Sequence, residues 1–560
     1  MGVSHMHPRS ARQAARLRQI VVISVLCLAI YCFLLVPEES LDSSRSTNPE
    51  AYQSRPHHEH QGHREEERYA LPPELLNNRF LTEDQCRATF PGLLKEVDDE
   101  VAKGPFELER YPTDLGPLIA RIRDGQLYIL SAARRADLSR DMLAHRSATL
   151  HQISNALLTW PQPSSSSSSS SSPFSHIPNT TFAFNHHDDP SPSAFSYSRP
   201  ADPVLLQEKN GRLRRFFVAP HFSFYSWPLP FIGSLPRAAR AIADLESATP
   251  FARKIPRAVW RGTTWFNNPR AGRLRQNLVR TFGSQDARRA RAWADIEALD
   301  WTTPAVGGGA AVVVGSGERN ASNALRIEDF CRYKYIIHTE GVTYSGRFQF
   351  HNLCASVVLT PPVAWMQHVT HLLRPVFSYT LDLEAPDSLS SSSSSSSSAF
   401  SSPRLSPRSF FASFFGATGQ RRKDGVGKQA NKAAGLPRRP IDLGDQKPPD
   451  LSRYPAPWVR SAWPTEHDAS DANIVFVAPD WSDLEATVLW LEAHPRIAEG
   501  IARRQRALFD GGGYFSPAAE MCYWRGLIRG WSEVARIDEG AFGDLEEMPW
   551  EEFSLKEIHK

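Results

Sequence analysis

Apolar runs that end in polar, glycine-bearing turns recur along the middle of the chain. The clearest one predicts a strand at Tyr335–His338, then a turn and a short helix, then a second strand at Val357–Leu359. A similar unit starts with the apolar run Ala258–Trp260 and leads into a helix on which Leu274 and Leu278 share a face. Strands that alternate with helices indicate an α/β fold with parallel sheets, which bind ligands at the carboxyl ends of their strands.

The C-terminal part of the chain repeats this order of strand and helix. The stretch NIVFVAPDWSDLEATVLWLEAH, from Asn473 to His494, begins with a strand and continues into a helix. Ser482 and Glu485 have the spacing of a capping box at the start of that helix. Three apolar residues share one helix face and are expected to be buried, namely Leu484, Val488 and Leu491.

The N-terminal region predicts a membrane anchor. Ile20–Val36 is uncharged over a length just sufficient to span a bilayer as a helix. Arginines precede this segment, and Glu38 and Glu39 follow it, so we expect a cytoplasmic N-terminus and a lumenal remainder. The alternative is a cleaved signal peptide, which requires a small-residue cleavage site, and Pro37 followed by two glutamates does not provide one.

Charge and cysteine content narrow the class of protein. The formal net charge of +3 is too small to imply a nucleic-acid partner. Cys27 and Cys32 lie in the predicted anchor, and the four lumenal cysteines could form two disulfides whose pairing the sequence leaves open. A buried free thiol is an equal alternative for Cys354, which lies on an apolar helix face. Glycosylation sequons at Asn179 and Asn320 fit a lumenal chain. The four lumenal cysteines are Cys86, Cys331, Cys354 and Cys522.

The turn after Tyr335–His338 predicts an anion-binding site. If Ser345 caps the next helix, the N–H groups of its first turn face the crevice beyond the strand and favour an anion. Gly346 lets the backbone approach a ligand, and the Arg347 guanidinium suits phosphate oxygens. Arg261, at the end of the earlier strand, could supply a second guanidinium, and the two would hold a diphosphate without a metal. The alternative is that both arginines are ordinary solvated residues.

A second candidate site is FAFNHHDDP, from Phe182 to Pro190. Its histidines and aspartates are metal-ligand types, but adjacent residues of an extended strand point to opposite faces and cannot all converge. We therefore predict no resident metal, while a divalent ion held by one carboxylate stays open. The preferred interpretation is a single aspartate at a strand end that acts as a general base. The four candidates are His186, His187, Asp188 and Asp189.

Four stretches resemble glycosyltransferase family 90, which includes the fungal capsule-associated xylosyltransferases and the Rumi-type protein O-glucosyltransferases. They are WRG at Trp260–Gly262, CRYKYIIHTEGVTYSGRFQFHNLCASVVL at Cys331–Leu359, DWSDLEATVLWLEAHP at Asp480–Pro495 and CYWRGL at Cys522–Leu527. The resemblance runs in order from Phe182 to Trp531 and is interrupted by a basic insertion. Phe80–Phe106 also resembles the leader of a fungal Golgi-type subgroup.

The resemblance implies a GT-B-like fold of two Rossmann-type domains, a UDP-sugar donor and inversion at the anomeric carbon. The general base of the Rumi type is the aspartate of an Asn-x-x-Asp-x-Pro motif, which is Asp188 here. Two positions depart from that type, because Asp189 stands where an aromatic residue is common and Gly346 stands where phenylalanine is found. The implied donor-binding residues are Arg261, Gly262, Thr263, Val342, Thr343, Tyr344, Ser345, Gly346 and Arg347.

Composition and resemblance together give an expected organisation, with the head behind a single N-terminal transmembrane helix. The expected segments are a cytoplasmic tail (1–19), a signal anchor (20–36), a flexible stem (37–75), an N-terminal acceptor and base domain (76–245) with a Ser-rich loop (163–173), a nucleotide-sugar domain (246–384), a disordered Ser-rich and basic insertion (385–450) and the C-terminal part of the catalytic head (451–560).

The expected function is transfer of a sugar, with xylose or glucose favoured, from a UDP-sugar to a hydroxyl of a glycan, glycolipid or protein. We expect a single-pass type II protein of the Golgi or endoplasmic reticulum membrane with a lumenal head. No cofactor is required by the sequence, although Asp188 and Asp189 could recruit manganese. The alternative function is a non-catalytic lumenal module that binds sugar or protein on the same fold, because a fold alone does not establish activity.

Overall fold

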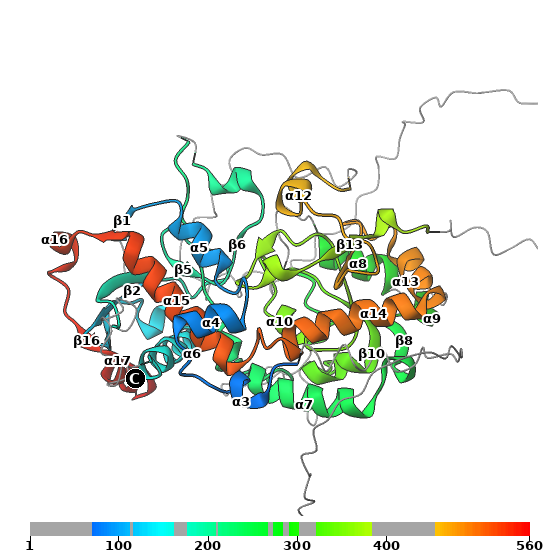
Figure 1. Cartoon of the computed structure of the whole chain (residues 1–560), viewed down its shortest axis with the longest axis horizontal. Coiled ribbons are helices and arrows are strands. Elements are labelled where there is room, and N and C mark those ends of the chain that lie inside the picture. Colours follow the sequence, from blue (N-terminus) through cyan, green and yellow to red (C-terminus); the bar gives the residue numbers. More distant parts are fainter. Residues whose placement is uncertain are drawn as a thin grey trace, which may run out of the picture. The chain divides into compact units, whose positions relative to one another are not determined.

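The structure is a computed structural model that describes residues 70–111, 116–161, 176–208, 211–266, 273–283, 290–301, 321–383 and 454–559 (Figure 1). The chain divides into two units, Met1–Gln61 and Gly62–Lys560, and every described residue lies in the second. The predicted anchor (20–36), most of the predicted stem (37–75) and the predicted insertion (385–450) lie outside the described residues. Within the described part, no helix has both the length and the apolar character that a membrane span requires.

A six-stranded, entirely parallel sheet forms the middle of the chain, in the order β13-β14-β11-β10-β8-β9. Its strands are β8 (Ile255–Gly262), β9 (Ala294–Ala298), β10 (Tyr333–Ile337), β11 (Val357–Thr360), β13 (Pro375–Phe377) and β14 (Ile474–Phe476). The apolar runs at Ala258, Tyr335, Val357 and Ile474 therefore become adjacent strands, as their alternation with helices predicts. This confirms the expected α/β class with a parallel sheet.

A second six-stranded sheet is mixed, with the order β16-β3-β2-β4-β5-β7. Its strands are β2 (Leu118–Arg123), β3 (Gln126–Ser131), β4 (Thr180–Phe184), β5 (Phe195–Ser196), β7 (Phe217–Val218) and β16 (Met548–Pro549). Only the β4-β5-β7 part is parallel, and the remaining pairings are antiparallel. An α/β chain with parallel strands fits a glycosyltransferase-like fold, while only one of its two large sheets has the all-parallel strands of a Rossmann-type domain.

Two small sheets join distant parts of the chain. In the first, β1 (Phe106–Leu108) runs parallel to β15 (Ala535–Ile537). In the second, β6 (Arg199–Pro200) runs antiparallel to β12 (Trp365–Met366), and the backbone N–H of Ala201 donates to the carbonyl of Ala364 at 2.8 Å. Because β6 follows β5 of the mixed sheet in sequence and β12 follows β11 of the parallel sheet, this pairing links the segments that leave these two strands.

Helices surround both sheets (Figure 1). They are α3 (Pro73–Leu76), α4 (Glu83–Thr89), α5 (Lys95–Val101), α6 (Arg140–Leu158), α7 (Leu235–Ala248), α8 (Leu274–Phe282), α9 (Ala290–Trp293), α10 (Phe348–His351), α12 (Pro457–Ala462), α13 (Leu484–Ala493), α14 (Pro495–Arg506), α15 (Pro517–Val534), α16 (Glu539–Phe542) and α17 (Trp550–His559). Leu484, Val488 and Leu491 of α13 are buried as predicted. The predicted capping box of this helix does not form, because Ser482 Oγ donates to Asp480 Oδ1 at 2.7 Å.

The long helix α15 returns the chain to the mixed sheet. Tyr523 donates to the carbonyl of Val218 at 2.8 Å, and Trp531 donates to the carbonyl of Thr181 at 3.0 Å. A disulfide between Cys86 and Cys522 joins this helix to α4. The long-range hydrogen bonds and the disulfide therefore hold the last part of the chain on a sheet that starts far earlier in sequence.

A buried polar network fixes the segments that enter β8 and β11. Lys254 Nζ donates to Glu246 Oε1 at 2.6 Å, to the Cys331 carbonyl at 2.7 Å and to Ser356 Oγ at 3.2 Å. Cys331 forms a disulfide with Cys354, so the alternative of a free Cys354 thiol was wrong. Burial lowers the pKa of Lys254, and the adjacent Glu246 carboxylate opposes that shift. A buried charge of this kind persists only with close partners, and the partners here set the start of β8 and β11, the two strands that flank β10.

Candidate functional site

The carboxyl ends of strands from both large sheets contribute to one cluster. Asp188 follows β4 of the mixed sheet, and Thr343 and Tyr344 follow β10 of the parallel sheet. Thr343 Oγ1 donates to the Asp188 carbonyl at 2.8 Å, and the Tyr344 hydroxyl donates to Asp188 Oδ1 at 3.4 Å. The predicted base and the predicted donor-binding segment, separated by more than a hundred residues in sequence, are therefore in direct contact.

Asn185 shapes the turn that carries Asp188. Its Nδ2 donates to the Asp189 carbonyl at 2.6 Å, and its Oδ1 accepts from the backbone N–H of His187 at 3.2 Å. Asn185 is 3% exposed, whereas Asp188 is an exposed residue at the tip of the turn. A buried amide that satisfies the turn backbone thus presents one carboxylate outward, as expected for a group that meets a substrate.

Two buried tyrosines lie on the inner side of this carboxylate. Burial raises the pKa of Tyr344 well above its ordinary value, and the negative charge of Asp188 adds to that effect. Burial also raises the pKa of Tyr197, whose hydroxyl is 2.8 Å from Thr149 Oγ1. Both phenols therefore stay protonated at neutral pH, and Tyr344 acts as a hydrogen-bond donor to Asp188.

The predicted donor-binding turn, Val342–Arg347, does not lead into a helix capped by Ser345. The helix after it, α10, is one turn long, and its N-cap residue is Arg347 instead of Ser345. Ser345 contributes its carbonyl, which accepts from the backbone N–H of Phe348 at 3.0 Å. The prediction that Ser345 caps a helix was wrong, because the chain tightens into a single turn around the buried Phe348. A helix dipole therefore adds little here, and the positive charge must come from side chains.

Arg347 faces the end of the neighbouring strand β8, where its guanidinium donates to the Arg261 carbonyl. Arg261 itself turns toward β9, and its guanidinium pairs with Asp295 Oδ1 at 2.7 Å. The part played by Arg261 in binding a diphosphate stays a prediction, and its ion pair shows that this charge is already balanced within the protein. Gly262 allows close packing, because a Cβ there would lie 2.6 Å from the Trp260 ring.

Arg275 of α8 is a site residue that the sequence analysis missed. Its guanidinium donates to the carbonyls of Thr263 at 3.3 Å and Glu340 at 3.0 Å, and also to Thr339 Oγ1 at 3.1 Å. Arg275 thereby joins the loop after β8 to the loop after β10. One signal was present in the sequence, because Arg275 lies three residues before the buried Leu278 and shares its helix face.

Arg275 and Arg347 form a pair of close, poorly balanced positive charges. Burial and the nearby charge of Arg347 together lower the pKa of Arg275 to about 9, although Asp188 and Glu340 oppose the shift. Burial lowers the pKa of Arg347 to about 10. In the part of the chain that the structure describes, neither guanidinium forms an ion pair with a carboxylate. Such a pair is suited to a bound anion that brings the missing negative charge.

The remaining predicted donor-binding residues lie in the loops that follow β8 and β10. Thr263, Thr343, Tyr344, Ser345 and Gly346 are buried, and Val342 is half-buried. The Gly341 backbone N–H donates to the carbonyls of Thr343 at 3.0 Å and Tyr344 at 3.2 Å, which closes the turn on itself. The predicted residues are thus brought together around the ends of β8 and β10, apart from the guanidinium of Arg261.

Among the described residues, no group of three potential metal ligands converges around Asp188. Among the described residues, the one group whose ligand atoms lie close enough to hold an ion is Glu246, Cys331 and Cys354. The sulfur atoms of both cysteines are bonded to each other in a disulfide and are not available as thiolate ligands, so this group is not a metal centre. The possibility that Asp188 and Asp189 recruit manganese with a substrate stays a prediction.

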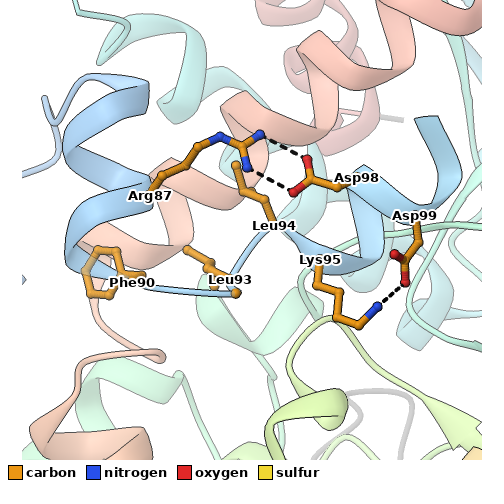
Figure 2. A pocket seen from close by; sticks show the side chains of 8 residues that line it. Arg87, Phe90, Leu93, Leu94, Lys95, Asp98 and Asp99 are labelled. Carbon is orange, nitrogen blue, oxygen red and sulfur yellow. Dashed lines mark hydrogen bonds and ion pairs between the residues drawn. The ribbon is translucent and has the colours of Figure 1, made fainter. Parts of the chain in front are cut away.

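A cavity of about 350 Å³ lies elsewhere, on α4 and α5 (Figure 2). Its charged residues form two ion pairs. The Arg87 guanidinium makes a bidentate contact with the Asp98 carboxylate at 2.9 and 3.0 Å, and Lys95 pairs with Asp99. These side chains are about half exposed. With its charges already paired and open to solvent, this hollow offers no excess charge for a phosphate or a reacting group.

Comparison with known families agrees with this arrangement. Residues 172–387 match the family model described as Glycosyl transferase family 90. This range contains Asp188, Arg275 and Arg347. It ends shortly after β13, the last strand of the parallel sheet before the predicted insertion. The match supports assignment to glycosyltransferase family 90 and, in general terms, a glycosyltransferase activity that uses a sugar donor and an acceptor. No curated protein matches the chain.

Arg347→Ala is expected to weaken the binding of UDP by about 10- to 100-fold, because a hydrogen bond to a charged group is worth about 1.5–3 kcal/mol. Isothermal titration of UDP into the purified chain would measure the change. Arg273→Ala is a matched control, since Arg273 is an exposed arginine at the start of α8. Equal UDP affinity in Arg347→Ala and wild type, or an equal loss in the control, would contradict the anion site.

Proposed function

We propose that the chain is an inverting glycosyltransferase that moves a sugar from a UDP-sugar to a hydroxyl group of its acceptor. The observation that carries this proposal is the contact between an exposed carboxylate, Asp188, and the turn after β10. Arg347 belongs to this turn, and Arg275 of α8 bonds to the same loop, and neither guanidinium is balanced by an ion pair among the described residues. One side of the site is suited to take a proton, and the other side is suited to hold a diphosphate.

The proposed reaction is a single displacement at the anomeric carbon. The acceptor hydroxyl gives its proton to the Asp188 carboxylate while its oxygen forms a bond to C1 of the sugar. The bond between C1 and the diphosphate oxygen breaks with its electron pair, so that UDP leaves. A single attack from the opposite face inverts the configuration at C1.

The charges of the site fit the charge that develops in this reaction. The sugar acquires oxocarbenium-like character and the leaving diphosphate gains negative charge, which Arg275 and Arg347 would stabilise. Tyr344 keeps its proton and donates to Asp188 at 3.4 Å, so it orients the carboxylate. Positioned donors that do not need to reorganise supply the largest electrostatic benefit in such a step.

The substrates follow from the family and not from the geometry. We propose xylose or glucose as the transferred sugar and a glycan, glycolipid or protein hydroxyl as the acceptor. The fungal capsule-associated and Rumi-type relatives motivate this choice, and the two departures at Asp189 and Gly346 lie next to the base and in the donor turn. A screen of UDP-sugars that measures UDP release with and without EDTA distinguishes the donors and tests for manganese.

We also propose that the head is lumenal, in the Golgi or endoplasmic reticulum, behind a signal anchor at 20–36. The apolar segment with arginines before it and glutamates after it supports this topology. The disulfides Cys86–Cys522 and Cys331–Cys354 also support it, because structural disulfides persist in oxidising compartments.

Asp188→Asn is expected to leave UDP affinity near the wild-type value and to lower sugar transfer by about two to four powers of ten, because the amide cannot accept the proton. The UDP-sugar found in the donor screen would be used, with UDP titration as the binding readout. Asp189→Asn is the matched control, being the adjacent carboxylate of the same turn. Wild-type transfer by Asp188→Asn would refute the base assignment. UDP binding with no turnover of any donor by wild type would favour the non-catalytic module.

Protease treatment of intact microsomes is expected to spare the head, since residues after Val36 are proposed to be lumenal. Detergent should then make the same head sensitive, which controls for intrinsic resistance. Digestion of the head in sealed microsomes would contradict the proposed topology.

A further inference from the structure

Trp481 has a backbone conformation that a tryptophan seldom adopts. Its φ is 66°, in the left-handed region, where the Cβ of a bulky residue is crowded by its own backbone. The other non-glycine residues with a positive φ in the described part of the chain are Asp124 and Ser193, two small polar residues of turns. Trp481 is also buried, with 1% of its surface exposed. Such strain persists only where the surrounding contacts outweigh it, and it is concentrated at functional sites.

The turn after β14 holds Trp481 in this conformation. The backbone N–H of Trp481 donates to the Ala478 carbonyl at 2.9 Å. The Asp483 carboxylate accepts from the backbone N–H of Ala478 at 2.9 and 3.1 Å, and it also accepts from the Ser378 hydroxyl. Because β14 belongs to the parallel sheet, this turn lies at the same edge of the sheet as the loops after β8 and β10.

The indole of Trp481 is bonded to the first residue of α8. Its Nε1–H donates to the Leu274 carbonyl at 2.9 Å, and the two side chains belong to one buried apolar cluster. Arg273, the N-cap residue of α8, makes no side-chain capping bond. The strained turn therefore supplies, from a distant part of the chain, a fixed contact at a helix start that its own cap residue does not hold.

This contact lies one residue from Arg275. The Arg275 guanidinium donates to the carbonyls of Thr263 and Glu340, which belong to two different loops. A planar guanidinium satisfies several acceptors at once only when its backbone starts from the correct place. A change in the position at which α8 begins would therefore change how Arg275 faces the proposed anion site.

We propose that Trp481 is a positioning residue for Arg275, and that its strained conformation is retained because the indole must meet the start of α8. This inference rests on the proposed function and deepens it by assigning a role to the motif at Asp480–Pro495. Trp481 lies outside residues 172–387, which match the family model. The part of the chain after the predicted insertion thus contributes to nucleotide binding without touching the nucleotide.

The test measures UDP affinity by isothermal titration in wild type, Trp481→Phe, Arg275→Ala and the double variant. Trp481→Phe keeps a buried aromatic ring and removes the N–H, so it is expected to weaken UDP binding by about three- to tenfold, the range of one neutral hydrogen bond. In the Arg275→Ala background the same substitution is expected to have no further effect, because the guanidinium that it displaces is absent. A merely structural role would lower the affinity by the same factor in both backgrounds.

Trp531→Phe is the matched control. The Trp531 indole is also fully buried and donates to a backbone carbonyl, that of Thr181, at 3.0 Å, but it lies on the mixed sheet. This variant should bind UDP with wild-type affinity. If Trp481→Phe does not fold, as judged by thermal unfolding, hydrogen–deuterium exchange of wild type replaces it. Saturating UDP should then slow the exchange of amides in 478–484, because coupling between two sites is reciprocal.

Three results would overturn the inference while leaving the proposed function intact. They are wild-type UDP affinity in folded Trp481→Phe, an equal loss of affinity with and without Arg275, and exchange in 478–484 that UDP does not change. UDP affinity that Arg275→Ala leaves unchanged, or wild-type protein that does not bind UDP, would overturn the anion site and this inference together.

Discussion

Two guanidinium groups, one buried (Arg275) and one half-buried (Arg347), constrain this site more than any other feature, because neither forms an ion pair with a carboxylate among the described residues. Arg275 and Arg347 lie at the ends of β8 and β10, where they hold backbone carbonyls of both loops. Their mutual repulsion and burial lower the pKa of Arg275 to about 9. Charges in this condition raise the free energy of the unliganded protein, and an anionic ligand would relieve that cost. The rest of the site is arranged around this excess of charge.

The mixed sheet contributes the proposed general base, and the parallel sheet contributes the proposed anion site. The carboxyl end of β4 brings an exposed carboxylate to the donor turn, and Thr343 and Tyr344 hold it there with hydrogen bonds. The pairing of β6 with β12 links the segments that leave β5 and β11, and Glu340 reinforces it by accepting from the N–H groups of Ala364 and Trp365. The proposed general base and the proposed anion site are therefore held together by short contacts between parts distant in sequence.

Local sequence patterns predicted strands of the parallel sheet, and contacts between distant segments determined the features that these patterns did not predict. Alternating apolar runs located β8, β10, β11 and β14, because periodicity reflects burial directly. The helix cap at Ser345 failed because the chain tightens into a single turn, α10, whose N-cap is Arg347, and the cap at Ser482 failed because the Ser482 hydroxyl donates to Asp480. Spacing carries no information on such competing partners.

The contacts of Arg275, the antiparallel part of the second sheet and the disulfide pairing could not be predicted from spacing for the same reason. Each depends on which distant segments come together, as in the disulfide that joins Cys86 to Cys522 across almost the whole head. The resemblance of the base motif pointed to Asp188, which lies inside the family match over 172–387, but neither comparison revealed the imidazole of His221, which fills the space beside Gly346.

Hydrogen–deuterium exchange of the purified chain with saturating UDP tests most directly whether the nucleotide binds at these strand ends. The account predicts slower exchange of the backbone amides in 339–348 and 261–264, with little change around the cavity on α4 and α5. Protection confined to 87–99, or no protection near β8 and β10 at a UDP concentration that saturates calorimetric binding, would contradict it.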